Sequence, residues 1–132
     1  MKLQGIIHDR RTWFYLFILL TIAIGYLSLI KAPTVQIAFD VRNRTMHFLA
    51  YFVYSLVIGM WRSIVNGEKK RVTSFTQASI IPVVYGSLLE WLQMYLPGRD
   101  ADPVDGLFNI LGGITGAALA CFYLSRHYFF RK

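Results

Sequence analysis

Four long apolar segments divide this chain. They cover residues 12–30, 46–65, 75–96 and 104–125. Each is close to the roughly 20 residues that a helix needs to cross the hydrocarbon core of a bilayer. The connections between them are too short to form a separate soluble domain. The pattern therefore predicts an all-α, polytopic membrane protein with four transmembrane helices in a single domain.

The composition agrees with this prediction. Of the 132 residues, 55% are hydrophobic and 16% are charged, whereas a soluble domain of this size needs more charge to cover its surface. Because Arg10 and Arg11 precede the first segment, it resembles the apolar core of a secretory signal, but it is longer than such a core. Leu29-Ile30-Lys31 offers no small-residue cleavage site, so we expect an uncleaved first helix.

The positive charges are unevenly placed along the chain. Ten of the 14 Lys and Arg residues lie in the N-terminal tail, the second connection and the C-terminal tail. Because basic connections stay preferentially in the cytoplasm, this bias predicts that both termini are cytoplasmic. The net charge of +7 then reflects topology and contact with anionic lipid, and we expect no nucleic-acid binding.

Turn-forming residues mark several of the expected helix ends. Asn66-Gly67 predicts a turn in the second connection, and Asp102 with Pro103 predicts an N-cap followed by the first residue of the fourth helix. Pro82 lies inside the third apolar segment. A transmembrane helix tolerates such a proline when a neighbouring helix satisfies the carbonyl that has lost its donor.

Polar side chains gather at the predicted outer ends of three helices. They are His47 and Tyr51 in the second helix, Glu90 and Gln93 in the third, and Asp105 and Asn109 in the fourth. Each pair is three or four residues apart and therefore lies on one helix face. Glu90 is about 9 Å inside the end of its segment, at 1.5 Å per residue. The spacing predicts that three helices converge on one polar site in the outer leaflet.

Several of these residues also have a purely structural explanation. Asp105 could interact favourably with the helix dipole, and Asn109 could hydrogen-bond to a neighbouring helix. His47 could be satisfied at the membrane interface, and Arg99 could pair with acidic residues of its own loop. Glu90 is the hardest to explain in this way, because an ionisable group at membrane depth costs several kcal/mol unless it is paired or wetted.

Two glycines on the fourth helix predict a close helix contact. Gly112 and Gly116 form a Gly-x-x-x-Gly motif, which lets two helix backbones approach each other. The motif is compatible with packing inside the bundle and with a contact between protomers, so a homo-oligomer through Gly112 and Gly116 is one of the two alternatives.

The full set of motifs resembles the VanZ-like family of bacterial membrane proteins. The matching elements are Arg44 followed by His47-Phe48-x-x-Tyr51, then Glu90-x-x-Gln93, Pro97-x-Arg99, Asp105-x-x-x-Asn109 and the glycines from Gly112 to Gly116. They cover over half of the chain in the family's order and spacing. The resemblance implies a multi-pass protein of the bacterial cytoplasmic membrane and a link to low-level resistance to the glycopeptide teicoplanin. The charge bias predicts that the active face is extracytoplasmic.

The chain departs from the family pattern at one position. Members of the family often have an acidic residue followed by Lys three residues before the histidine, and this chain has Asn43-Arg44 there. The basic residue is kept, while the carboxylate is either missing or supplied by Asp40. A mechanism that requires a carboxylate at position 43 is therefore in doubt for this chain.

The polar set suits chemistry on a lipid-linked cell-envelope precursor or a lipid headgroup. We expect Arg44 and Arg99 to bind a phosphate or carboxylate, because a guanidinium group matches both. Glu90 or Asp105 would serve as general base with His47 as its acid or base partner. Gln93, Asn109 and Tyr51 complete the expected substrate-binding set. The enzyme would be a hydrolase or a transferase.

Two other functions are compatible with the same residues. A non-catalytic protein could use them to bind or shield an envelope lipid or a glycopeptide. A transporter or proton relay would need polar residues through the inner halves of the helices, which hold little beyond Ser79 and Thr115. A metal site from His47, Glu90 and Asp105 is conceivable, but the chain lacks a closely spaced ligand pair such as His-x-x-x-His. We therefore predict no metal and no cofactor.

Overall fold

The computed structural model describes residues 9–30, 39–97 and 102–128, and all of their regular structure is helical. The chain forms α2 (Arg10–Leu29), α3 (Phe39–Asn66), the 3-10 turn η1 (Glu68–Lys70), α4 (Arg71–Gln93) and α5 (Pro103–Ala118). The last span continues as the π-helix η2 (Leu119–Leu124) and ends with α6 (Ser125–Tyr128). Four of these spans are long and apolar enough to cross a membrane, which confirms the predicted number.

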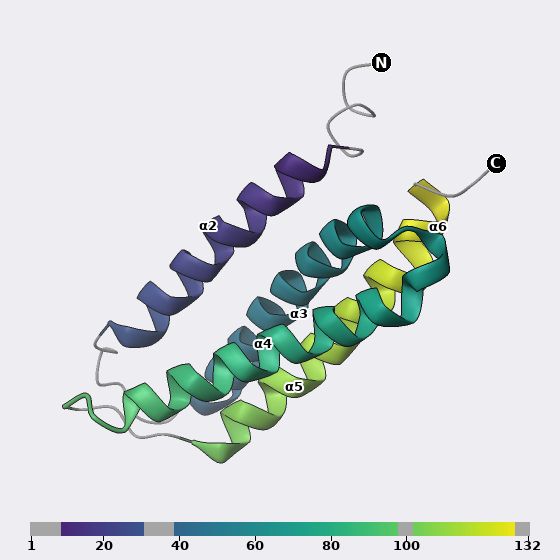
Figure 1. Cartoon of the computed structure of the whole chain (residues 1–132). Helices are drawn as coiled ribbons and strands as arrows, with labels where there is room; N and C mark the ends of the chain where they lie inside the picture. The colour runs from purple at the N-terminus through teal and green to yellow at the C-terminus, as the bar shows by residue number, and fades with distance from the viewer. Residues whose placement is uncertain (1–8, 31–38, 98–101, 129–132) are drawn as a thin grey trace.

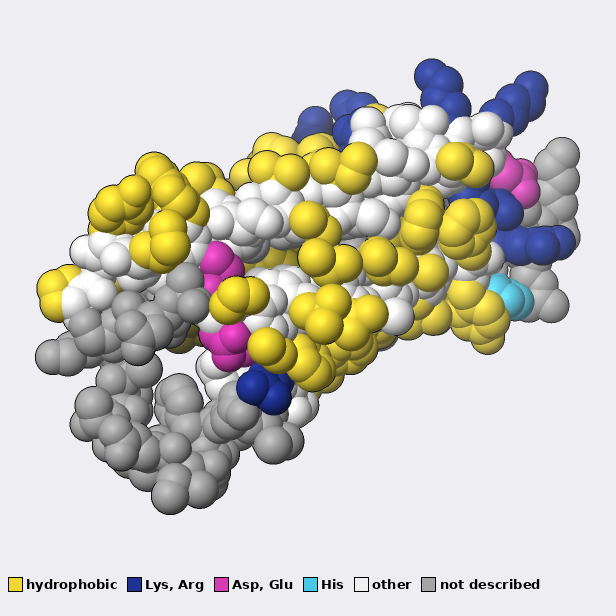
Figure 2. Space-filling view, turned by 90° about the horizontal axis from the view of Figure 1, so that it is seen from below, with side chains coloured by type: hydrophobic (Ala, Val, Ile, Leu, Met, Phe, Trp, Pro, Cys, Tyr) yellow, Lys and Arg dark blue, Asp and Glu magenta, His cyan; other side chains and the backbone are white. Residues whose placement is uncertain are grey.

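The helices lie side by side along one direction, with α3 between the others (Figure 1). The end of α3 meets the start of α4 near α6, and the end of α4 lies near the start of α5 at the opposite end of the bundle. Most Lys and Arg side chains gather at the first of these ends, and apolar side chains cover much of the flank (Figure 2). This distribution is the one expected for a bundle surrounded by lipid.

The helix ends follow from local chemistry. The Asp102 carboxylate accepts a hydrogen bond of 2.8 Å from the Val104 backbone N–H, and Pro103 is the first residue of α5. Both predictions for this helix start are confirmed. Gly67 has a φ angle of 73° between α3 and η1. This left-handed conformation favours glycine, and it confirms the predicted turn at Asn66-Gly67.

The proline inside α4 is compensated by a side chain from α3. Pro82 has no backbone N–H, so the Ala78 carbonyl loses its helical donor. The Ser55 hydroxyl lies 2.6 Å from the Ala78 carbonyl oxygen and 2.6 Å from the Gly113 carbonyl oxygen. The Ser55 hydroxyl has one proton, which it can donate to either of these two carbonyl oxygens. Ser55 itself is fully buried. The predicted role of a neighbouring helix at Pro82 is confirmed.

Close packing of α5 on α3 depends on the two predicted glycines. A Cβ at Gly112 would overlap the Phe48 carbonyl oxygen, and a Cβ at Gly116 would overlap the Phe52 carbonyl oxygen. The Gly-x-x-x-Gly stripe is therefore buried against α3 of the same chain. A contact between protomers through this stripe would require α5 to leave α3, so the alternative inside the bundle is the one that the packing supports.

Helix α2 is the least buried of the four spans, and both aromatic and polar contacts join it to the bundle. Only 6% of its apolar window is buried, and its outward side chains, such as Tyr15 and Ile22, are exposed. The Tyr85 hydroxyl donates to the Thr21 carbonyl at 2.6 Å, and the Thr21 and Tyr54 hydroxyls are 2.8 Å apart. These contacts fix α2 against α3 and α4, while its outer face is suited to lipid.

Two features differ from the expectation by more than the shift of three or four residues seen at the ends of α4, which covers Arg71–Gln93 in place of 75–96. Helix α3 begins at Phe39, about two turns before the predicted residue 46. The fourth span contains a π-helical stretch that the apolar pattern did not predict. Hydropathy detects neither feature. The extension of α3 is polar and therefore lies outside the apolar run, and the wider turns of a π-helix leave the apolar run unchanged. The first difference matters for the site, because it makes Asn43 and Arg44 helical.

We predict that Gly112→Ala destabilises the bundle by about 1–3 kcal/mol, the usual cost of overpacking. The added methyl group meets the backbone of α3, which cannot move without separating the helices. Thermal unfolding of the detergent-solubilised protein, followed by tryptophan fluorescence, measures the change. Gly106→Ala is the matched control, because a Cβ there meets nothing within 4 Å. Equal unfolding temperatures for the two variants would contradict this account of the α3–α5 contact.

Candidate functional site

Three helices bring one histidine and two carboxylates together at one end of the bundle. His47 comes from α3, Glu90 from α4 and Asp105 from α5. Each side chain offers a nitrogen or oxygen atom, and the three atoms lie within 4.8 Å of one another. The predicted convergence of three helices at this end is therefore present in the structure.

His47 is held by an amide on one side and faces a carboxylate on the other. Its Nδ1 lies 2.9 Å from Asn109 Oδ1, and because this oxygen can only accept, Nδ1 carries the proton. The opposite nitrogen, Nε2, lies 3.4 Å from Asp105 Oδ2. Asn109 thus sets the tautomer and the orientation of the ring. Nε2 is presented to the carboxylates.

Asp105 points into the bundle and does not cap its own helix. The N-cap of α5 is Asp102, whereas Asp105 Oδ2 accepts a hydrogen bond of 2.6 Å from Asn43 Nδ2. Its second oxygen, Oδ1, is buried and has no hydrogen-bond partner among the described residues. A buried carboxylate that is only partly satisfied is costly for the fold. Its position cannot be explained by helix capping alone.

Asn43 is chemically suited to the hydrogen bond that it makes with Asp105. An amide can donate to the Asp105 carboxylate, and the observed bond uses that donor. A carboxylate at the same position could not donate in its ionised form and would repel Asp105. The amide is therefore compatible with an ionised Asp105.

Glu90 is half-buried between these groups and the start of α5. The backbone N–H of Asp102 donates to its carboxylate, and the His47 and Asp105 side chains lie beside it. Arg44 lies near enough to attract the Asp105 carboxylate. The site thus combines two acidic groups with one imidazole and one guanidinium.

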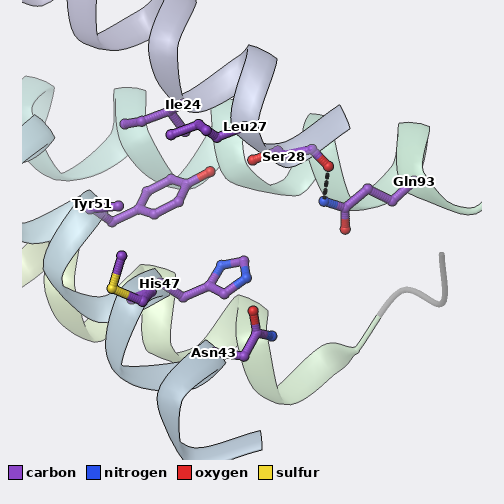
Figure 3. A pocket seen from close by; sticks show the side chains of 9 residues that line it. Ile24, Leu27, Ser28, Asn43, His47, Tyr51 and Gln93 are labelled. Carbon is purple, nitrogen blue, oxygen red and sulfur yellow. Dashed lines mark hydrogen bonds between the residues drawn. The ribbon is translucent and has the colours of Figure 1, made fainter. Parts of the chain in front are cut away.

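A cavity of about 180 Å³ adjoins this cluster. It lies between α2, α3 and α4, and His47 forms part of its wall (Figure 3). The polar part of the lining comprises Ser28, Asn43, His47, Tyr51 and Gln93, and the apolar part comprises Ile24, Leu27, Met46 and Ala50. Leu27 and Met46 are 60% and 62% exposed, respectively. The apolar rim therefore faces the surroundings of the bundle.

The predicted binding residues divide into three groups. Asn109 and Arg44 lie at the cluster, where Asn109 holds His47 and Arg44 attracts Asp105. Tyr51 and Gln93 line the adjoining cavity, and Gln93 Nε2 donates to the Ser28 carbonyl of α2 at 2.9 Å (Figure 3). Arg99 lies outside the described residues. The structure thus brings together all of the predicted site residues that it describes.

Sequence reasoning missed the contribution of α2. Ile24, Leu27 and Ser28 close one side of the cavity, although the first segment carries no polar cluster at this end. Ser28 participates through its backbone carbonyl, and a backbone contact leaves no signal in the residue pattern. Only the packing of α2 on the bundle shows it.

A second polar cluster at the opposite end was also missed. Arg62 Nε donates to Gln77 Oε1 at 2.7 Å, and Asn66 Nδ2 donates to Ser74 Oγ at 3.0 Å. The spacing of Arg62 and Asn66 by four residues, and of Ser74 and Gln77 by three, is a signal that could have identified this cluster. Along α3, the buried Ile58 lies between it and the site at His47.

Comparison of the chain with protein-family models, with curated proteins and with solved structures found no match. The motif resemblance to the VanZ-like family therefore stays an expectation from the sequence.

Proposed function

We propose that this chain is a multi-pass protein of the bacterial cytoplasmic membrane that acts on the polar headgroup of an envelope lipid or lipid-linked envelope precursor. The observation that carries the proposal is the position of the cavity. It has the His47–Glu90–Asp105 cluster beside its polar wall and an apolar rim at the flank of the bundle. An amphipathic ligand matches both surfaces at once.

The size of the cavity supports a headgroup and not a whole lipid. Sites that enclose a complete small molecule usually measure about 300–1,000 Å³, while this cavity measures about 180 Å³. The headgroup would enter between Asn43, His47 and Gln93. The acyl or prenyl chain would stay outside, along the exposed side chains of Leu27 and Met46, where its contact with lipid is retained.

The cluster offers the groups needed for acid–base catalysis. In the proposed reaction, Glu90 or Asp105 takes a proton from a water or a substrate hydroxyl, and the resulting oxygen attacks the headgroup. The bond between the attacked atom and its leaving oxygen breaks, the carboxyl group gives the proton that it gained to His47 Nε2, and His47 passes a proton from Nε2 to the leaving oxygen. Positioned groups of this kind typically accelerate a reaction by about 10²–10⁴-fold. Water as the attacking group would make a hydrolase, and a substrate hydroxyl would make a transferase.

Arg44 supplies the positive charge that an anionic headgroup requires. It lies beside Asp105 at the cluster, and a guanidinium group binds phosphate or carboxylate through paired donors. Arg99, which belongs to the same sequence motif set, is proposed as a second anion-binding group.

A non-catalytic binding protein is the alternative, and one observation favours it. The hydrogen bonds from Asn43 to Asp105 and between His47 and Asn109 join α3 to α5. These bonds would hold the bundle together in the absence of any reaction. In this alternative the cavity binds or shields an envelope lipid or a glycopeptide without changing it.

The resemblance to the VanZ-like family supports the cell envelope as the place of action. The charge bias supports cytoplasmic termini, with the site on the extracytoplasmic side. Together they connect the proposed headgroup chemistry with the glycopeptide resistance that the resemblance implies.

The proposed orientation predicts a labelling pattern in intact cells. In a Cys121→Ser background, Tyr95→Cys should react with a membrane-impermeant maleimide, because Tyr95 is exposed at the end that carries the site. Lys69→Cys, exposed at the opposite end, should react only after the cells are permeabilised. The reverse pattern would place the site in the cytoplasm and contradict the proposed envelope function.

Catalysis and binding make different predictions for three substitutions. If the protein is an enzyme, Glu90→Gln and Asp105→Asn should lower turnover by about 10²-fold or more while the lipid that co-purifies with the protein, measured by mass spectrometry, stays unchanged. Ala50→Leu narrows the cavity and should reduce the bound lipid itself.

Teicoplanin tolerance of cells that express each variant provides the readout where the reaction is not yet assayed. Glu68→Gln is the control, since it removes a carboxylate at the other end of the bundle. If Glu90→Gln loses bound lipid and tolerance in parallel, the binding alternative replaces the enzyme. If wild-type protein binds no lipid, the proposed function fails in both forms.

A further inference from the structure

The spacing of the cluster suggests more than acid–base pairing. His47 Nε2 and Asp105 Oδ2 are 3.4 Å apart, which is longer than the 2.7–3.2 Å of an ordinary N–H···O hydrogen bond. Two ligands bound at about 2.1 Å to one tetrahedral metal ion are separated by about 3.4 Å. The two atoms therefore have the separation of two ligands of a shared ion.

Glu90 completes a set of three ligands. Its carboxylate lies with the other two atoms inside a span of 4.8 Å. Ligands of a tetrahedral ion with bonds of about 2.1 Å are about 3.4 Å apart, so the half-buried Glu90 side chain would have to rotate toward the other two ligands by about 1.4 Å. Three protein ligands leave a fourth position for water or substrate, as in catalytic zinc sites.

The groups behind the ligands are arranged as in established metal centres. A metal-binding histidine usually donates its second ring N–H to a carbonyl or carboxylate oxygen, which fixes its orientation. Here Asn109 Oδ1 accepts from His47 Nδ1 at 2.9 Å. The ligating carboxylates of such sites are also hydrogen-bonded, and Asn43 donates to Asp105 at 2.6 Å. Asn43 and Asn109 thus aim both ligands at one point.

Asp105 gives an independent indication of a ligand. It is 7% exposed, and its Oδ1 has no hydrogen-bond partner among the described residues. The same small region holds a second carboxylate, so an ionised Glu90 and an ionised Asp105 repel each other. Arg44 lies near one of these charges. A divalent cation would offset the repulsion between the two carboxylates, and it would give Oδ1 a partner where Asp105 binds through both oxygens.

We infer that His47, Glu90 and Asp105 bind a first-row divalent metal ion, with Zn²⁺ as the best match. An imidazole nitrogen favours zinc over magnesium or calcium, which prefer all-oxygen sets with six or more ligands. This inference departs from the sequence analysis, which considered the same three residues and predicted no metal because they are spread over three helices and are not paired within one.

With the ion bound, His47, Glu90 and Asp105 serve as its ligands in place of acting as acid and base, and the open position takes part in the proposed function by binding the headgroup. A phosphate or carboxylate oxygen of the headgroup in the adjoining cavity would bind there, next to His47 on the cavity wall. This part of the inference rests on the proposed headgroup function, while the binding of the ion itself does not.

Zinc retention by the purified full-length protein tests the inference. The protein is stripped with EDTA, incubated with Zn²⁺, desalted and analysed by mass spectrometry for metal content. We expect one zinc per chain and a higher unfolding temperature in the presence of zinc. Glu90→Gln and His47→Ala should bind at least tenfold more weakly. Asn109→Leu should weaken binding by about 10–100-fold, the usual effect of losing a group that orients a ligand.

Glu90→Gln keeps the Asn43–Asp105 and His47–Asn109 pairs intact, so it separates loss of metal from loss of fold. His127→Ala and Glu68→Gln are the controls, since both residues are exposed and lie away from the cluster. Retention of no zinc by the wild type, or equal retention by Glu90→Gln and the wild type, would overturn the inference.

Lipid capture measured in EDTA keeps the two proposals apart. If the protein binds lipid but no zinc, the metal site is refuted and the headgroup function stands. If it binds zinc but no lipid, the headgroup function is refuted and the metal site stands.

Discussion

The close approach of α3 and α5 is the contact on which the rest of the structure depends. The two helices pack where Gly112 and Gly116 leave room for the backbone of α3. Because the helices run in the same direction, one register holds along the whole contact. Asn43 meets Asp105 and His47 meets Asn109 at the same offset of 62 residues. The packing of small residues in the core thus sets the geometry of the polar cluster near the helix ends.

Burial in this contact explains why the cluster is well defined. Asn109 and Asp105 are 3% and 7% exposed, so water cannot replace their partners without opening the bundle. A polar network of this kind favours one arrangement of the helices, since any shift leaves buried groups unsatisfied. Stability and site geometry are therefore coupled. A change in the helix packing is expected to alter the orientation of His47 as well as the folding free energy.

The sequence was sufficient to predict most of the fold. The apolar segments predicted four helices, and the structure has four spans of suitable length and hydropathy. The spacing of His47, Glu90, Asp105 and Asn109 predicted that their helices converge, and these side chains are in fact adjacent. Both predictions succeed because helix periodicity and the cost of polar groups in lipid act locally on the residue pattern.

The missed features depend on contacts that no local pattern records. Because α3 starts early, Asn43 is helical and can hydrogen-bond to Asp105. This contact depends on the polar side chains that α5 presents at that end of the bundle. The role of α2 depends on a backbone carbonyl at Ser28. The ligand-like spacing of His47 and Asp105 depends on the α3–α5 register. In each case the deciding interaction joins segments that are far apart in the chain.

The central claim is that the cavity beside His47 receives a lipid headgroup. A structure of the full-length protein in nanodiscs of bacterial lipid extract tests it most directly. The account predicts headgroup density within hydrogen-bonding distance of His47 or Asn43, with the attached chain running past Leu27 and Met46. A cavity filled by side chains, with lipid density only along the other faces of the bundle, would contradict it.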